Sequence, residues 1–465
     1  MSEGPADTVP GAAVDGIDAA LPAAAHRAGA GQQAGAGSRQ HSWLARVGLD
    51  GLGLADWLAL ATVFTASWMK LFIEPAGKLP YTTILAVAFI AVFAMERIRE
   101  RTPVVPRAVV QLGAITAAVT LAYLLGFGNL QAPVERVQFG KGITVWLVQA
   151  SFMVTLAWHV VLRGRRMLLL VAAAFVGGIT VNALYGLAQL ALLGAGLNLD
   201  RYVVTPLTLG QGKDGGAHHY GGNIYRINGL MRDTNHLGIT AASAAAFSLG
   251  WLRGRRLLAV GGTNAATTII SLSRSAMLGL AAGVAVAGWL RRRTINVVAV
   301  AGAAATLVVA VVLFALAAPD LYTSIVNSRL NLEGQGSQTH LRLYGVVPGM
   351  LDQNPLTGMG LNTFAIELES TSGRQGFGPH SYYIQVLTET GVLGALATAT
   401  LVGVGLAKAA RLGTPVAMGV TAAIVATLLG NVFYLTAHLL LLKVLLALAY
   451  AAPAVEARHA MQEAR

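Results

Sequence analysis

The sequence predicts an all-α membrane protein, a polytopic bundle of about twelve transmembrane helices with a long loop on the outer side. Of the 465 residues, 55% are hydrophobic and 12% are charged, whereas soluble domains carry about 25% charged residues. Repeated apolar runs of about 17–25 residues are long enough to cross a hydrocarbon core of about 30 Å as helices. A membrane β-barrel would instead show short segments that alternate between apolar and polar residues.

Residues 1–45 are expected to form a disordered cytoplasmic tail, because they are rich in Ala and Gly and show no hydrophobic periodicity. They lack the charged start, apolar centre and cleavage site of a signal peptide. The first apolar run is therefore expected to direct the chain to the membrane.

Apolar runs after the tail predict the membrane spans. The runs are residues 52–72, 82–98, 107–127, 142–162, 167–194, 235–252, 257–273, 275–290, 295–318, 382–407, 415–435 and 437–452. Spans one to nine fall within residues 46–318, and spans ten to twelve with a cytoplasmic C-terminus fall within 382–465.

The net charge of +12 is explained by topology rather than by binding to nucleic acid, because Lys and Arg accumulate in cytoplasmic loops. Basic residues follow every even-numbered span up to the tenth. They are Arg97, Arg99, Arg101 and Arg107; Arg163, Arg165 and Arg166; Arg253, Arg255 and Arg256; Arg291, Arg292 and Arg293; and Lys408 and Arg411. This alternation predicts that both termini are cytoplasmic.

Two long loops, about 195–234 and 319–381, follow odd-numbered spans and are therefore expected outside. Loops of this length are often functional, and the second is expected to hold one or two short helices. Candidate site residues fall in or beside these loops. They are His380, Arg226, Arg232, Arg274 and Arg342.

The arginines suggest an anionic lipid substrate, because a guanidinium group offers a planar, permanently charged fork to phosphate oxygens. Arg226 and Arg232 precede span six, where Thr234 and Asn235 are predicted to cap a helix whose N-terminus is itself an anion site. Arg274 lies in the short break between two apolar spans, and an ionisable group so close to the hydrocarbon core is a functional candidate. The alternatives are binding to lipid head groups or local carboxylates, and snorkelling to the interface.

Arg342 precedes a segment, residues 354–362, whose glycines would let the second loop fold back over a site. His380 closes that loop and is a candidate general base, since an imidazole titrates near pH 6.5. The alternative is an interfacial histidine beside Tyr382 and Tyr383, which could belong to an aromatic belt.

The sequence has no cysteine, no Asp-x-Asp pair, no phosphate-binding loop motif and no paired-histidine metal spacing. A metal or nucleotide cofactor is therefore not expected. The energy for a reaction outside the membrane must then come from within the substrate.

The chain resembles the O-antigen ligase and polymerase superfamily of bacterial inner-membrane glycosyltransferases. The resemblance rests on the number of spans, the long outer loop before span ten, and the ligase pattern His-[Asn/Ser/Gln]-x9-Gly-x-x-[Gly/Thr/Tyr]. That pattern reads here as His380-Ser381, nine residues, and Gly391-Val392-Leu393-Gly394.

The resemblance implies a GT-C-like fold and transfer of a glycan from undecaprenyl diphosphate to an acceptor on the periplasmic face, without metal or nucleotide. In ligases the acceptor is lipid A core; in polymerases it is another lipid-linked repeat unit. His380 would remove a proton from the acceptor in an inverting transfer. Arg274 and Arg342 would hold the diphosphate, and Arg226 and Arg232 are added from their position.

A ligase is favoured, because the polymerase pattern of Arg, ten residues and Gly does not fit at any of the four arginines. A polysaccharide polymerase and a protein O-glycosylation enzyme remain open. A transporter or flippase for an anionic lipid would show inverted repeats and polar groups at the midplane, whereas the charged candidates here cluster at one face. The Gly-rich segment 177–186 leaves this last alternative open.

Overall fold

A computed structural model describes residues 50–74, 78–100, 104–211, 218–220, 224–292, 344–372, 378–436 and 439–464, with residues 316, 319–320 and 323 as isolated positions. The chain divides into two compact units, Met1–Gly51 and Leu52–Arg465, and the second unit carries every feature below. The predicted tail, nearly all of the predicted ninth span and Arg342 lie outside the described residues.

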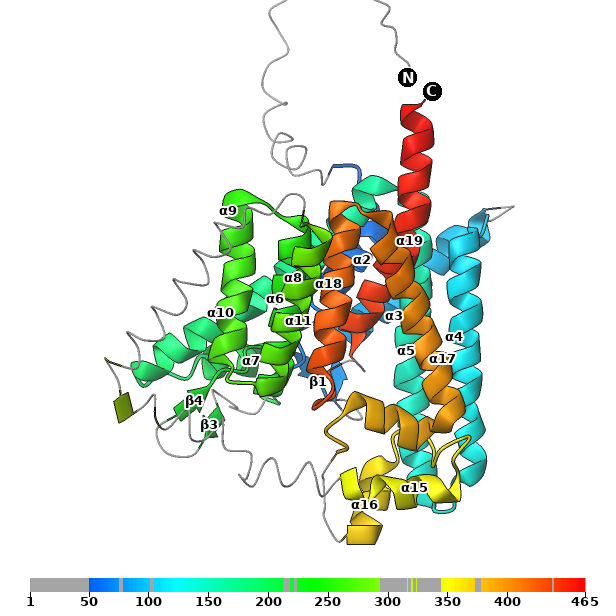
Figure 1. The fold of residues 1–465 in the computed structure, drawn as a ribbon, viewed down its shortest axis with the longest axis vertical. Helices are drawn as coiled ribbons and strands as arrows, with labels where there is room; N and C mark the ends of the chain where they lie inside the picture. Colours follow the sequence, from blue (N-terminus) through cyan, green and yellow to red (C-terminus); the bar gives the residue numbers. More distant parts are fainter. Residues whose placement is uncertain are drawn as a thin grey trace, which may run out of the picture. The chain divides into compact units, whose positions relative to one another are not determined.

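Helices make up most of the described structure (Figure 1). The helices that overlap the predicted spans are α2 (Leu54–Phe64), α3 (Tyr81–Arg99), α4 (Arg107–Leu125), α5 (Pro133–Arg163), α6 (Arg165–Gly194), α8 (Thr234–Trp251), the π-helical η2 (Leu257–Gly261), α10 (Gly262–Ile270), α11 (Arg274–Leu290), α17 (Tyr382–Leu412), α18 (Pro415–Gly430) and α19 (Leu440–Glu463). The short helix α9 (Gly254–Arg256) lies between the sixth and seventh predicted spans.

Six of these helices are long and apolar enough to cross a membrane: α3, α4 with the following turn η1 (Gly126–Asn129), α5, α6, α17 and α19. The all-α membrane fold is thus confirmed, while the count of twelve spans stays a prediction.

Short elements occupy the two long loops. They are α7 (Leu199–Leu207), β3 (His218–Tyr220), β4 (Ile224–Arg226), α15 (Val347–Gln353) and α16 (Phe364–Ser372). β3 and β4 form an antiparallel hairpin, as do β1 (Phe72–Ile73) and β2 (Leu79–Pro80). Figure 1 shows α7, the β3–β4 hairpin, α15 and α16 at the end of the helical bundle opposite the C-terminus. Both long loops therefore share one end, hereafter the loop end; that it faces outward stays a prediction.

Helices α8, α11 and α18 pack against one another through small residues. A Cβ on Gly283 of α11 would lie 2.6 Å from the Ala246 Cβ of α8, and a Cβ on Gly250 would lie 2.5 Å from the Gly419 nitrogen of α18. Such close approach of backbones is typical of membrane helices with small interfacial residues. It explains why α8, rich in Ala, Ser and Thr, is buried along nearly its whole length.

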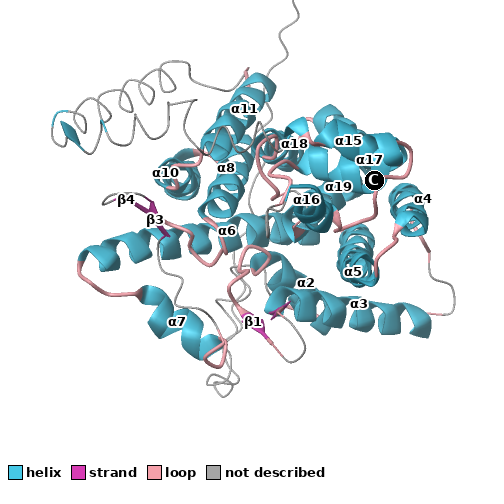
Figure 2. Cartoon of the chain, turned by 90° about the horizontal axis from the view of Figure 1, so that it is seen from below, coloured by secondary structure: helices cyan, strands magenta, loops and turns pink. Residues whose placement is uncertain are grey.

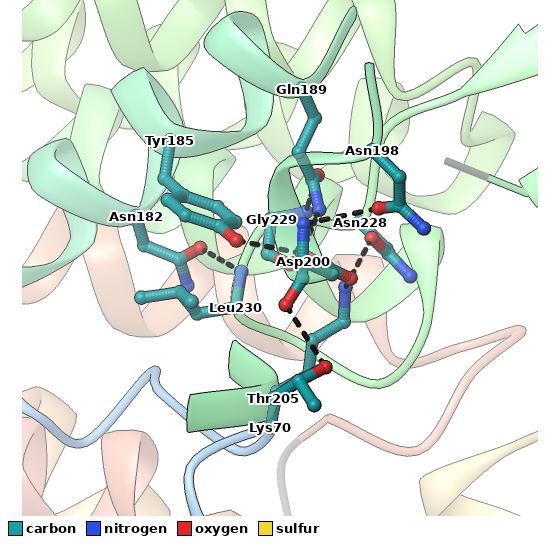
Figure 3. Close-up of polar contacts among 10 residues, drawn as sticks. All are labelled: Lys70, Asn182, Tyr185, Gln189, Asn198, Asp200, Thr205, Asn228, Gly229 and Leu230. Carbon is teal, nitrogen blue, oxygen red and sulfur yellow. Dashed lines mark hydrogen bonds and ion pairs between the residues drawn. The ribbon is translucent and has the colours of Figure 1, made fainter. Parts of the chain in front are cut away.

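A buried ion pair ties the loop end together (Figure 3). The Lys70 ammonium lies 2.5 Å from Asp200 Oδ2 and donates to Asn228 Oδ1 at 2.8 Å. The other Asp200 oxygen accepts hydrogen bonds from the Tyr185 hydroxyl and the Gln189 amide, both at 2.7 Å. Because Asp200 is completely buried, these donors together replace the water it would otherwise bind.

The same network fixes the turn that leads from β4 to α8 (Figure 3). The Gly229 amide donates to Gln189 Oε1 at 2.9 Å, and the Leu230 amide donates to Asn182 Oδ1 at 2.7 Å. The Lys70 amide in turn donates to the Leu230 carbonyl at 2.8 Å. The turn is therefore held by α6 on one side and by the segment after α2 on the other.

We predict that Lys70→Met strongly destabilises the protein, by about 3–5 kcal/mol, because it leaves the Asp200 carboxylate buried without its counter-charge. The double variant Lys70→Met/Asp200→Asn should recover part of this loss, since no charge is then buried. Thermal unfolding of the purified protein in detergent measures both effects.

Lys78→Met is the matched control, since Lys78 is exposed. This variant should unfold at the temperature of the wild type. A Lys70→Met variant as stable as the wild type would show that the ion pair contributes nothing.

Candidate active site

His380 lies immediately before α17, in a strained backbone conformation. Its φ angle is +48°, a left-handed value that is uncommon for residues other than glycine and is found preferentially at functional sites. The next segment is anchored, because the Tyr382 amide donates to the carbonyls of Asn431 at 3.2 Å and Tyr434 at 3.0 Å. The loop between α18 and α19 therefore fixes the position of His380.

The half-buried His380 imidazole has a pKa below its ordinary value, because burial disfavours the charged ring; the nearby Asp233 carboxylate opposes this effect. A lowered pKa leaves the ring neutral near pH 7, which is the form that accepts a proton. His380 is thus electrostatically suited to act as a base.

Asp233 caps α8, with its carboxylate accepting a hydrogen bond from the Asn235 amide at 2.7 Å. The prediction that Thr234 and Asn235 cap this helix was therefore wrong. Thr234 is already the first helical residue, so the capping position falls one residue earlier, where a carboxylate is among the preferred groups.

Arg226 joins two of the predicted site segments. Its side chain is buried; Nε donates to the Ser271 carbonyl at 2.8 Å, and Nη2 donates to Asn235 Oδ1 at 3.0 Å. The break that precedes α11 is thereby connected to the first turn of α8. Asn235, which the sequence suggested only as a cap, orients this guanidinium group.

Tyr434 completes the cluster, and the sequence did not single it out. Its ring lies edge-on to the His236 ring, with 5.0 Å between centroids. Burial, together with the charge and a hydrogen bond of Asp233, raises its pKa, whereas the Arg226 charge lowers it. The predicted span 415–435 included Tyr434, but α18 ends at Gly430, and the tyrosine therefore lies in the loop.

The remaining arginines have different settings. Arg274 is exposed and is the first residue of α11, which Ser273 caps by accepting the Ala276 amide at 3.3 Å. Arg232 is exposed, and its guanidinium carbon lies 5.7 Å from the centre of the Phe72 ring. Arg342 lies outside the described residues. The structure thus connects the segments of His380, Arg226 and Arg274, and places Arg232 against β1.

The first glycine of the sequence pattern interrupts α17. Gly391 has φ +63° and ψ −170°, and a Cβ there would lie 2.3 Å from the Leu356 carbonyl carbon. The break exposes two amides to the loop, since Val392 donates to the Pro355 carbonyl at 2.9 Å and Leu393 donates to the Leu356 carbonyl at 3.1 Å. Only glycine combines this conformation with this close approach.

Glu389, just before the break, holds the same loop. Its carbonyl accepts the Gly360 amide at 3.0 Å, and its carboxylate accepts the Phe364 amide at 3.3 Å. The stretch from His380 to Gly391 therefore has a base at one end and a docked loop at the other. The segment 354–362 docks on α17 through Pro355, Leu356 and Gly360, and its folding over a site stays a prediction.

The cluster combines groups that suit an anionic substrate with a hydroxyl nucleophile. The starts of α8 and α11 lie side by side, because a Cβ on Gly238 of α8 would lie 2.8 Å from the Ala276 Cβ of α11. Helix N-termini carry partial positive charge and favour phosphate groups. The site thus brings together the His380 imidazole, the Arg226 guanidinium group and two helix N-termini.

Comparison with known proteins agrees with this chemistry. Residues 257–399 match the family model described as O-antigen ligase, and this range includes Arg274, Arg342, His380 and Gly391. No curated protein matches the chain. Members of the matched family are glycosyltransferase-like enzymes, and the family implies lipid-linked glycan substrates in a membrane. The similarity of residues 257–399 to this family supports the resemblance of the chain to the O-antigen ligase and polymerase superfamily.

Proposed function

We propose that the protein is an O-antigen ligase-like glycosyltransferase. It moves a glycan from undecaprenyl diphosphate to lipid A core on the periplasmic face of the inner membrane. The observation that carries this proposal is one cluster of side chains. In it, the Asp233 charge raises the pKa of both His380 and Tyr434, and Arg226 donates to the Ser271 carbonyl just before α11. A base and phosphate-binding groups thereby share one site.

His380 accepts the proton of the acceptor hydroxyl while that oxygen attacks the anomeric carbon of the donor. The bond between the anomeric carbon and the diphosphate oxygen breaks as the new glycosidic bond forms, with inversion at the carbon. The released undecaprenyl diphosphate carries the additional negative charge. No nucleotide or metal is needed for this balance, because the diphosphate is itself the leaving group.

The arginines stabilise the charge that grows on the diphosphate, an effect that contributes several kcal/mol in a sheltered site. Arg274 is best placed to touch the diphosphate, because it is exposed at the start of α11. Arg226 is engaged with Ser271 and Asn235 and therefore positions the break. Arg232 and Arg342 supply further positive charge in this assignment.

Reconstitution of the purified full chain with an undecaprenyl diphosphate-linked glycan tests the proposal, with and without lipid A core. A product that forms only with lipid A core supports a ligase, whereas a ladder formed from the donor alone indicates a polymerase. Absence of any product, beside an active reference enzyme, would contradict a transferase and favour transport or another acceptor.

We predict that His380→Ala lowers the transfer rate by about 10²–10⁴-fold, the usual contribution of a general base. The initial rate of product formation in the reconstituted system measures this loss. His459→Ala is the control, because His459 lies near the C-terminus of α19 and contacts Arg165. Wild-type activity in the His380→Ala variant would remove this residue from the mechanism.

We predict that the acid limb of the pH–rate profile moves to lower pH in Asp233→Asn. The base must be neutral, so activity falls as the pH drops through the His380 pKa. The Asp233 charge raises the His380 pKa. Its removal in Asp233→Asn therefore lowers this pKa further. Asn caps helices as well as Asp does, so the fold of α8 should be retained.

Transfer rates measured between pH 4 and 8, a range about the ordinary histidine pKa, locate this limb. Asp352→Asn, an exposed substitution on α15, should leave the profile unchanged. A limb that stays in place or moves to higher pH in Asp233→Asn would argue against His380 as the titrating base.

We predict that Arg274→Ala weakens inhibition by the product undecaprenyl diphosphate by about 10–100-fold, the effect of losing charge-assisted hydrogen bonds. The inhibition constant in the transfer assay measures this change. Arg255→Ala is the matched control, since Arg255 is exposed at the opposite end of α10 from Arg274. Equal inhibition of the Arg274→Ala variant and the wild type would exclude a contact between Arg274 and the diphosphate.

A further inference from the structure

A cavity of about 320 Å³ lies among α4, α5, α17 and α19, apart from the cluster around Arg226. These four helices are neighbours in the bundle (Figure 2). The volume of the cavity is at the lower end of the range for small-molecule sites, about 300–1,000 Å³. Tyr382 lines the cavity and is separated from His380 by one residue, so the cavity adjoins the candidate active site along the chain.

Aromatic rings form part of the cavity wall. The centroids of Tyr123 and Trp146 are 4.8 Å apart. Their polar atoms are already engaged, because Trp146 Nε1 donates to Thr120 Oγ1 at 2.9 Å and the Tyr123 hydroxyl lies 3.1 Å from Thr398 Oγ1. These side chains therefore offer ring surface to a ligand, a surface that packs against apolar C–H groups.

A buried carboxylate also lines the cavity. Glu389 is 2% exposed, and its Oε1 accepts the Phe364 amide. The Asn362 backbone amide and the Gln385 side chain lie close to this carboxylate, yet Oε2 has no partner with hydrogen-bond geometry in the described part of the chain. A buried polar atom in this state calls for a donor. A hydroxyl group on a ligand in the cavity would supply one.

Further polar groups line the same space. Gln149 and Gln385 contribute amides, and the Lys443 ammonium lies 5.9 Å from the centre of the Trp146 ring. Half of the lining residues are charged or carry an amide or hydroxyl group in an aliphatic side chain. A polyprenyl tail, which has no polar groups, would leave these amide and carboxylate groups unpaired. Aromatic surface together with carboxylate and amide groups suits a ring that has C–H faces and several hydroxyls.

We propose that this cavity binds a sugar ring of the glycan substrate. The proposal rests on the proposed glycosyltransfer and adds a carbohydrate subsite to it. Trp146 and Tyr123 pack against the sugar ring, while Glu389 and Gln149 bind its hydroxyl groups. The donor glycan and the acceptor core share this chemistry, and the experiment below distinguishes them.

Binding is measured by calorimetry on the purified full chain, without any transfer step. The two probes are the glycan released from its undecaprenyl diphosphate donor and the core oligosaccharide released from lipopolysaccharide. Trp146→Leu and Gln149→Leu should each weaken binding of at least one probe by about tenfold, since each loses a contact of roughly 1.4 kcal/mol. Trp146→Tyr should retain most of the affinity, because it keeps an aromatic face.

Trp158→Leu and Gln111→Leu are matched controls on α5 and α4 that do not line the cavity, and they should bind as the wild type does. The probe whose affinity falls identifies the sugar as donor or acceptor. Absence of binding to the wild type, or unchanged affinity in both Trp146→Leu and Gln149→Leu, would overturn the subsite. Glycan binding with the expected losses but no transfer would contradict the proposed reaction and support the subsite.

Discussion

The loop end of the bundle depends on the buried contact between Lys70 and Asp200. Charges of opposite sign are tolerated in such a place only when further hydrogen bonds satisfy them. Here Tyr185 and Gln189 satisfy one carboxylate oxygen, and Asn228 shares the ammonium. Because Asn228 belongs to the turn between β4 and α8, a contact made for charge compensation also fixes the chain on which Arg226 and Asp233 lie.

The fixed turn from β4 to α8 holds Arg226 and Asp233 in the positions that form the candidate site. The Arg226 guanidinium group donates hydrogen bonds to Ser271 and Asn235, and these bonds align the starts of α8 and α11. Asp233 caps α8, and its charge also raises the pKa of His380. The candidate base His380 therefore lies in one segment of the chain, whereas its electrostatic partner Asp233 and the nearby Arg226 guanidinium group lie in another, the turn from β4 to α8. Each segment is held by backbone contacts, which is the preorganisation that charge stabilisation requires.

The sequence predicted the helices well, because long apolar runs separated by basic clusters leave few alternatives. The spacing singled out His380 and Gly391, both of which have left-handed backbone conformations, while the role of His380 stays a prediction. It could not predict the Lys70–Asp200 pair, whose members are 130 positions apart, nor the role of Asn235. The position of Tyr434 was not predicted, because residues 415–435 read as one largely apolar run. In the structure α18 ends at Gly430, and the Tyr382 amide donates to the carbonyls of Asn431 and Tyr434 beyond it.

The spacing between His380 and Gly391 has a physical meaning that the pattern alone does not state. The nine helical residues from Tyr382 to Thr390 span about 14 Å, so one short helical segment separates the strained histidine from the broken turn. The break at Gly391 binds the loop at Pro355 and Leu356, and Glu389 beside it contacts Phe364 and lines the cavity. The segment thus connects the candidate base His380 to the wall of the cavity, which Tyr382 and Glu389 both line. A rigid connection of this kind keeps the distance between them constant, which a transferase with a carbohydrate subsite requires.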